Sequence, residues 1–237
     1  MLIPYFQKLT LLDFPGHTAA TVFTDGCNLR CPFCHNASLV ERHPEEYIDT
    51  EEFFRFLEKR AGLLDGVCIT GGEPLLQKDL ADFIRRVRAS GFAVKLDTNG
   101  TFPEKLEELL REGLVDHVAM DIKNCLNKYP LTAGTEDEKA DELCNKIRRS
   151  IELIAHLAPD YEFRTTVVDE LHSVEDVESI AKMLLHTASP DVKYYIQCFK
   201  DSGDILCPGL SSPEQSTLEA MLDAAKRHLT NASLRGV

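Results

Sequence analysis

Six short apolar runs alternate with amphipathic stretches along most of the chain. The runs lie at residues 18–24, 66–70, 92–98, 116–122, 161–168 and 192–199. Apolar runs of this length are typical of strands buried in a parallel sheet, and the stretches between them carry apolar residues at helical spacing. Strands that alternate with helices in series predict a parallel sheet with helices on its outer face.

Capping residues support the helices that this pattern predicts. Asp49 or Thr50 is placed to cap the first helix, and Ser173 with Asp176 is close to a capping box. Ser212 and Gln215 give the last helix an N-terminal signature. Helices are expected at residues 50–64, 76–90, 103–113, around 147–154, at 173–186 and at 212–229.

The predicted fold class is α/β, and the chain is expected to be one domain. Residues 1–17 form an N-terminal extension, and residues 18–237 hold six βα units. Six units are too few for an eight-stranded barrel. A curved, incomplete barrel fits better than a flat doubly wound sheet, although periodicity does not separate the two. In both architectures, catalytic groups collect at the C-terminal ends of the strands.

Polar or unusual residues do follow the predicted strands, and we expect them to face one mouth. In strand order they are Cys27, Cys31 and Cys34; Gly71, Gly72, Glu73 and Pro74; Asp97, Thr98 and Asn99; Asp121 and Lys123; Arg164; and Gln197.

Composition excludes several classes of function. Lys and Arg total 26 against 39 Asp and Glu, a net charge of −13, which argues against a protein that coats nucleic acid. No apolar run approaches the length of a membrane span and no secretory signal is seen, so a cytoplasmic protein is expected. Thiols stay reduced there, so the eight cysteines are read as metal ligands and core thiols rather than disulfides.

Three of the cysteines, Cys27, Cys31 and Cys34, lie within eight positions. A structural zinc site is closed by four ligands, and this chain has no second cysteine pair. His35 adjoins Cys34, but neighbouring residues seldom converge on one metal. A 4Fe-4S cluster normally takes four thiolates, so three leave one iron open to a substrate.

The C-x3-C-x2-C spacing, followed by GGEP at residues 71–74, resembles the radical S-adenosylmethionine (SAM) superfamily. LLDFPGHTAATVFTDGCNLRCPFCHN, LDTNG, MDIK and FRTTV resemble the activating enzymes of glycyl-radical enzymes. Those of anaerobic ribonucleoside-triphosphate reductase are the nearest match, and pyruvate formate-lyase activating enzyme is similar. The resemblance implies a partial (β/α)6 barrel of the radical SAM type.

The resemblance also implies roles for the residues at the mouth. Cys27, Cys31 and Cys34 would ligate three irons of a 4Fe-4S cluster whose fourth iron binds SAM. Backbone from Gly71 to Pro74 and the Glu73 carboxylate would meet the methionine amino group. The remaining SAM-binding positions implied are Phe33, Asp97, Thr98, Asn99, Asp121, Lys123, Arg164 and Gln197, and a monovalent cation could be held by Asp97, Thr98 and Met120.

Each of these roles has a simpler structural alternative. Phe33 could shield the cluster rather than stack near adenine, and Gln197 could be a structural amide. Lys123 and Arg164 could belong to ion pairs at the sheet edge. Cys68 and Cys198 are expected to be core thiols, and no role is assigned to Cys125, Cys144 and Cys207.

The implied reaction is reductive cleavage of SAM, followed by removal of a hydrogen atom from a glycine of a partner enzyme. The implied partners are a glycyl-radical enzyme, with anaerobic ribonucleoside-triphosphate reductase as the first candidate, and flavodoxin or ferredoxin as electron donor.

Two alternative functions stay open. The first is a radical SAM enzyme that acts on a pyruvate formate-lyase type partner, on a peptide or on a small molecule. The second is a non-catalytic protein that binds a cluster or zinc. Loops 124–139 and 200–212 are candidates for partner docking or a lid.

Overall fold

The computed structural model describes residues 1–41, 45–135, 139–201 and 203–236. One sheet of eight strands runs through it in the order β1 to β8. Strands β2 to β8 are parallel, and β1 pairs with β2 in the antiparallel direction. The strands are β1 Tyr5–Thr10, β2 Ala19–Thr24, β3 Gly66–Gly71, β4 Ala93–Thr98, β5 His117–Asp121, β6 Tyr161–Val167, β7 Tyr194–Cys198 and β8 Ala232–Arg235.

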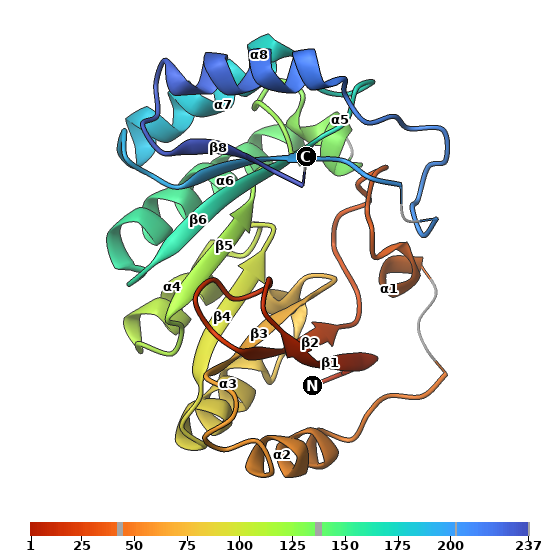
Figure 1. The fold of residues 1–237 in the computed structure, drawn as a ribbon, viewed down its shortest axis with the longest axis vertical. Helices are drawn as coiled ribbons and strands as arrows, with labels where there is room; N and C mark the ends of the chain where they lie inside the picture. The colour runs from red at the N-terminus through yellow and green to blue at the C-terminus, as the bar shows by residue number, and fades with distance from the viewer. Residues whose placement is uncertain (42–44, 136–138, 202, 237) are drawn as a thin grey trace.

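The main helices connect successive strands and cover the outer side of the sheet, which curves from β1 to β8 (Figure 1). The helices are α1 Ala37–Glu41, α2 Thr50–Glu58, α3 Leu80–Ala89, α4 Pro103–Arg111, α5 Tyr129–Ala133, α6 Ala140–Leu157, α7 Val174–Thr187 and α8 Gln215–Lys226, with a 3-10 turn at Pro74–Leu76. No helix within these described parts of the chain is long and apolar enough to cross a membrane.

The predicted α/β class and the six serial parallel strands are confirmed as β2 to β7. The expectation of six strands was incomplete, because β1 lies inside the predicted N-terminal extension and β8 follows the last helix. Five of the six β1 side chains are at least partly exposed. An exposed edge strand and a four-residue strand do not give the apolar runs by which buried strands are recognised.

Several helix termini agree with the sequence and others do not. Of the two candidate caps of α2, Asp49 is the N-cap residue, and its side chain accepts a hydrogen bond from the Glu51 N–H. Ser173 with Asp176 forms a full capping box, as predicted. The expected start of the last helix at Ser212 was wrong, because Glu214 is its N-cap residue and makes no side-chain cap. Helix α2 ends at Glu58, before the expected 64, and α3 begins at Leu80 because a 3-10 turn occupies Pro74–Leu76.

Candidate functional site

A cavity opens where strands β2 to β6 end. It is lined by Cys27, Leu29, Cys31, Phe33, Cys34, His35, Asn36, Val40, Thr70, Gly71, Gly72, Asp97, Thr98, Asn99, Asp121, Lys123, Arg164 and Thr166. Twelve of the fifteen site residues predicted from sequence are in this lining. The three others, Glu73, Pro74 and Gln197, lie outside it.

The cysteine loop is held against the glycines that follow β3. The Glu73 N–H donates to the Gly26 carbonyl at 2.8 Å, and a Cβ on Gly72 would come within 2.0 Å of that same oxygen. The Asn36 side chain donates to the Gly71 carbonyl at 2.9 Å. The resemblance implied that backbone from Gly71 to Pro74 approaches a ligand, whereas here Gly72 makes room for the cysteine loop itself.

Helix α5 supports the other side of the cysteine loop, inside a stretch that was expected to be a loop. The Arg30 N–H donates to the Ala133 carbonyl at 2.9 Å. Gly134 has a φ of 65°, and a Cβ there would lie 2.1 Å from the Arg30 carbonyl oxygen. The sequence marks this contact only through Gly134, because a five-residue helix leaves no clear periodic pattern.

The segment after β7 also reaches the cysteine loop. The Cys207 N–H donates to the Pro32 carbonyl at 2.9 Å, and Ser38 donates to Asp204 at 2.7 Å. The rings of His35 and Phe199 stack with centroids 5.3 Å apart. Both loops predicted to border the mouth therefore touch the cysteine loop, with residues 136–138 and 202 outside the described chain.

All three thiols that line the cavity are free, and no fourth cysteine lines it in the described chain. Burial raises the pKa of each thiol, that of Cys31 to about 12, while the Lys123 ammonium acts in the opposite direction. No group of three His, Cys, Asp or Glu side chains is arranged for a single metal ion in the ranges described. Three thiols that line one cavity can ligate three irons of a 4Fe-4S cluster, which leaves the fourth iron for another ligand.

The sulfur of Cys27 has two N–H groups beside it. The Leu29 N–H lies 3.5 Å from the sulfur, and the side-chain nitrogen of Asn99 lies 3.8 Å away. Asn99 is 6% exposed and comes from the DTNG stretch that ends β4. Asn99 was expected among the SAM-binding residues, and its contact with a cysteine was not predicted.

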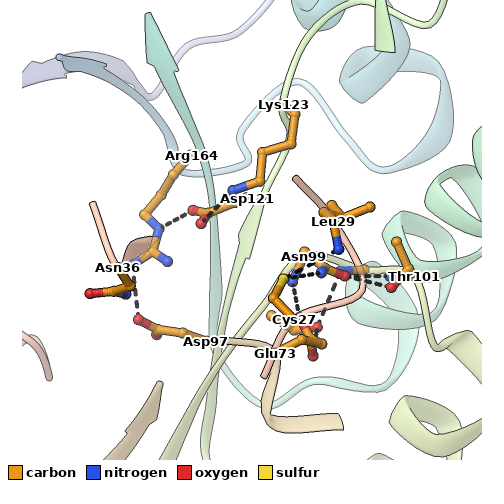
Figure 2. A network of polar contacts seen from close by, with 12 residues as sticks. Cys27, Leu29, Asn36, Glu73, Asp97, Asn99, Thr101, Asp121, Lys123 and Arg164 are labelled. Atoms are coloured by element: carbon orange, nitrogen blue, oxygen red, sulfur yellow. Dashed lines mark hydrogen bonds and ion pairs between the residues drawn. The ribbon is translucent and has the colours of Figure 1, made fainter. Parts of the chain in front are cut away.

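Glu73 lies under this contact rather than in the cavity (Figure 2). Its carboxylate is fully buried and accepts hydrogen bonds from the Leu75 N–H, the Thr98 hydroxyl and the Asn99 N–H, at 3.1, 2.9 and 2.7 Å. Burial raises its pKa to about 7, although the three hydrogen bonds act in the opposite direction. Its carboxylate therefore joins the loops after β3 and β4, and does not point to a ligand in the cavity.

Charged side chains from three neighbouring strand ends form one ion-pair network, with Asp121 between Arg164 and Lys123 (Figure 2). Asp121 accepts from Arg164 Nε at 2.8 Å and from Lys123 Nζ at 3.1 Å. Arg164 also lies 3.4 Å from Asp97, whose second oxygen pairs with Lys95. The two opposite charges hold the pKa of Asp121 well below its usual range despite burial.

A buried histidine that the sequence analysis missed fixes the backbone at Lys123. His172 is 5% exposed, and its Nε2 lies 2.8 Å from the Lys123 carbonyl oxygen. The Val168 N–H donates to its Nδ1 at 3.1 Å. These partners fit a neutral ring with the proton on Nε2, and burial lowers the pKa of His172 in agreement.

The remaining predicted residues lie at the margin of the site. Phe33 is 5% exposed and lines the cavity, and its ring makes an edge-to-face contact with that of His172. Pro74 begins the 3-10 turn, and Gln197 lies in β7 beside Thr166. Met120 is fully buried in β5.

The five cysteines outside the cluster motif are spread through the fold. Cys68 is buried in β3, as expected, whereas the expected core thiol Cys198 is only partly buried in β7. Cys125 is buried and lies 3.3 Å from Asp176, Cys144 is partly buried, and Cys207 is exposed.

Comparison with known protein families shows which family this chain belongs to. The family model of the Radical SAM superfamily matches residues 21–184, which span the cysteine loop, the ion-pair network and strands β3 to β6. The chain belongs to the radical SAM superfamily. It is therefore a radical SAM enzyme, and membership implies a 4Fe-4S cluster and SAM.

Relatives cover the whole of this radical SAM chain. A protein of Methanocaldococcus jannaschii named "Putative glycyl-radical enzyme activating enzyme" is 35% identical, over 100% of this chain and 96% of its own length. Among solved structures, QueE from Escherichia coli has a TM-score of 0.57 at 16% identity, covering 100% of this chain and 94% of QueE. SAM-bound SuiB of Streptococcus suis has a TM-score of 0.68 at 13% identity, covering 89% of this chain and 48% of SuiB. At this low identity, these two structural similarities show only that the chain shares the fold of QueE and SuiB.

Proposed function

We propose that this radical SAM enzyme is the activating enzyme of a glycyl-radical enzyme, with anaerobic ribonucleoside-triphosphate reductase as its partner. The observation that carries the activating-enzyme part of the proposal is the match to the Methanocaldococcus protein named "Putative glycyl-radical enzyme activating enzyme", over 100% of this chain and 96% of that protein. The choice of the reductase as partner rests on the sequence resemblance alone. The LDTNG, MDIK and FRTTV stretches, which resemble the activases of this reductase, supply three neighbouring strand ends of the cavity.

In this proposal Cys27, Cys31 and Cys34 hold the cluster, and the charged network at the strand ends receives SAM. When bound, the cluster and SAM supply one-electron chemistry that removes a hydrogen atom from the substrate. Because burial keeps the free thiols protonated, cluster assembly must release protons, and the nearby Lys123 charge favours that step.

Arg164 and Lys123 are suited to orient the carboxylate of SAM. Both side chains are mostly buried, at 14% and 17% exposure, and Asp121 holds them at the edge of the cavity. Cations preorganised in this way bind an anionic group without first having to be ordered. The electron donor in this proposal is a flavodoxin or ferredoxin.

The test is electron paramagnetic resonance under anaerobic conditions. The reconstituted and reduced protein is mixed with SAM and the anaerobic ribonucleotide reductase of the same genome. The proposal expects a glycine-centred doublet on the reductase together with 5'-deoxyadenosine. Release of 5'-deoxyadenosine without the doublet would reject this partner, and tests with other glycyl-radical enzymes would then follow.

Two cysteine variants sharpen this experiment. Cys31→Ala removes a proposed cluster ligand and is expected to abolish both signals. Cys144→Ala removes a partly buried thiol in α6, outside the cavity, and is expected to retain both. A doublet of normal size from Cys31→Ala would reject the ligand assignment.

A further inference from the structure

We infer that Lys95 is a built-in counter-ion of Asp97, and that it replaces the monovalent cation that the resemblance implied at this position. The enzyme would then bind SAM without needing K⁺ or Na⁺. This inference rests on the SAM site of the proposed function, and it concerns how the charge of that site is balanced.

Lys95 is buried inside the barrel. It precedes Asp97 by two residues on β4, so both side chains leave the same face of the strand. The Lys95 side chain is 1% exposed, and its ammonium is ion-paired with Asp97 Oδ1. The sulfur of Cys68, on the neighbouring strand β3, lies 3.9 Å from the same nitrogen.

The second oxygen of Asp97 also has a cationic partner. Arg164 Nη1 lies 3.4 Å from Oδ2, and the side chain of Asp97 is 15% exposed. The charges of Arg164 and Lys95 hold the pKa of Asp97 below its usual range, although burial acts the other way. Each oxygen of this carboxylate is therefore already balanced by a cation of the chain itself.

The other two side chains expected at a cation site are engaged elsewhere. The Thr98 hydroxyl donates to Glu73 at 2.9 Å. Met120 is fully buried and packs under Gly100, where a Cβ would lie 2.2 Å from its terminal methyl group. The Thr98 hydroxyl also accepts from the Gly100 N–H at 3.1 Å, and the Met120 side chain has no oxygen, so neither side chain supplies an oxygen ligand for a metal cation beside Asp97.

The charge balance of the ion-pair network also disfavours a bound metal cation. The network that contains Asp97 joins three cations, Lys95, Lys123 and Arg164, to two carboxylates, Asp97 and Asp121. Glu162, 3.9 Å from Arg164, adds a third carboxylate, and Arg235 adds a fourth cation, because its two nitrogens lie 2.8 and 3.1 Å from Glu162. In the protein without its cluster, this network has one positive charge left over, which favours an added carboxylate and disfavours an added cation.

The first test changes only the salt. SAM binding to the reconstituted, oxidised enzyme is measured by titration calorimetry in potassium, sodium and choline chloride at equal ionic strength. We expect dissociation constants that agree within about twofold, a difference near the thermal energy. Binding that is about tenfold weaker in choline would overturn the inference.

The second test uses Lys95→Met, which keeps an unbranched side chain without its charge. In choline, SAM binding is expected to weaken by about tenfold or more, because Asp97 loses one partner, and potassium is expected to restore part of it. Lys182→Met, which removes an exposed lysine of α7, is the matched control and should bind normally. Normal binding by Lys95→Met in choline would also overturn the inference.

A third measurement separates this inference from the proposed function. The melting temperature of the metal-free protein is compared in the three salts, where no cluster or SAM is involved. We expect no potassium-specific rise for the wild type and a rise for Lys95→Met. A potassium-specific rise in the wild type would contradict the inference. Failure to bind SAM in every salt, alongside the expected melting pattern, would count against the proposed function alone.

Discussion

The side-chain nitrogen of Asn99 lies 3.8 Å from the sulfur of Cys27, within reach of a weak N–H···S hydrogen bond. The orientation of the amide is fixed by its other contacts. Thr101 donates to Asn99 Oδ1 through its N–H and its hydroxyl, at 3.0 and 2.7 Å. The Asn99 backbone N–H is held by Glu73 at 2.7 Å. The amide nitrogen is thereby left facing the sulfur and the Asn28 oxygen.

Asn99→Ala is expected to make the reduction potential of the cluster more negative. Hydrogen bonds to cluster sulfurs stabilise the reduced, more negative state, so removing a donor favours the oxidised one. The measurement is a redox titration followed by electron paramagnetic resonance. Asn231→Ala, which removes an exposed amide bound to the Asp191 carbonyl, is the control. An unchanged or more positive potential in Asn99→Ala would contradict this role.

Asp97→Asn is expected to destabilise the metal-free protein by about 3–5 kcal/mol, because it leaves the buried Lys95 ammonium without its carboxylate. The measurement is urea denaturation at pH 7. Asp82→Asn breaks an exposed ion pair with Arg85 and is expected to cost less than about 1 kcal/mol. Equal losses for the two variants would show that the buried pair contributes little.

Glu73 gives a pH dependence with a definite sign. Its pKa rises from 4.5 to about 7 on folding, because the carboxylate is buried. A raised carboxyl pKa stabilises the fold below pH 4.5, and that contribution is lost as the pH rises through 7. The free energy of unfolding of the wild type, minus that of Glu73→Gln, is therefore expected to fall by about 3 kcal/mol between pH 4.5 and 8. A difference that stays constant would mean an ordinary pKa.

Gly72→Ala is expected to prevent normal cluster assembly, because the added Cβ would lie 2.0 Å from the Gly26 carbonyl and displace the cysteine loop. Iron content and the cluster absorption spectrum provide the measurement. Gly91→Ala is the control. Its φ of 89° adds backbone strain of about 1–2 kcal/mol, but the Cβ meets no atom within 4 Å. Full cluster content in Gly72→Ala would refute the packing argument.

The sequence predicted most of the parts that position the site. Buried parallel strands leave continuous apolar runs, so β2 to β7 were found, and with them the strand ends that carry the cysteines, Asp121 and Arg164. Caps such as Asp49 and Ser173 act through local hydrogen bonds that a sequence displays directly. Edge strands such as β1 bury too little to leave that signal.

The direction of charged side chains was not predictable in the same way. Glu73 was expected to face a ligand and is instead buried under Asn99. Lys95 lies between apolar neighbours on β4, and its sequence position does not reveal that its ammonium reaches Asp97 inside the barrel. Glu73 is oriented by Thr98 and Asn99 at the end of another strand, and such long-range contacts leave no local pattern. The spacing of Lys95 and Asp97 does place them on one face of β4, but the sequence does not show that this face is the buried one.

The most direct test of the radical SAM assignment is formation of 5'-deoxyadenosine from SAM by the reconstituted, dithionite-reduced protein without a partner. We expect product from the wild type and from Cys144→Ala, and none from Cys27→Ala, Cys31→Ala or Cys34→Ala. No product from a wild type with a full cluster, or undiminished product from any of the three variants, would contradict the assignment of this cavity as a radical SAM site.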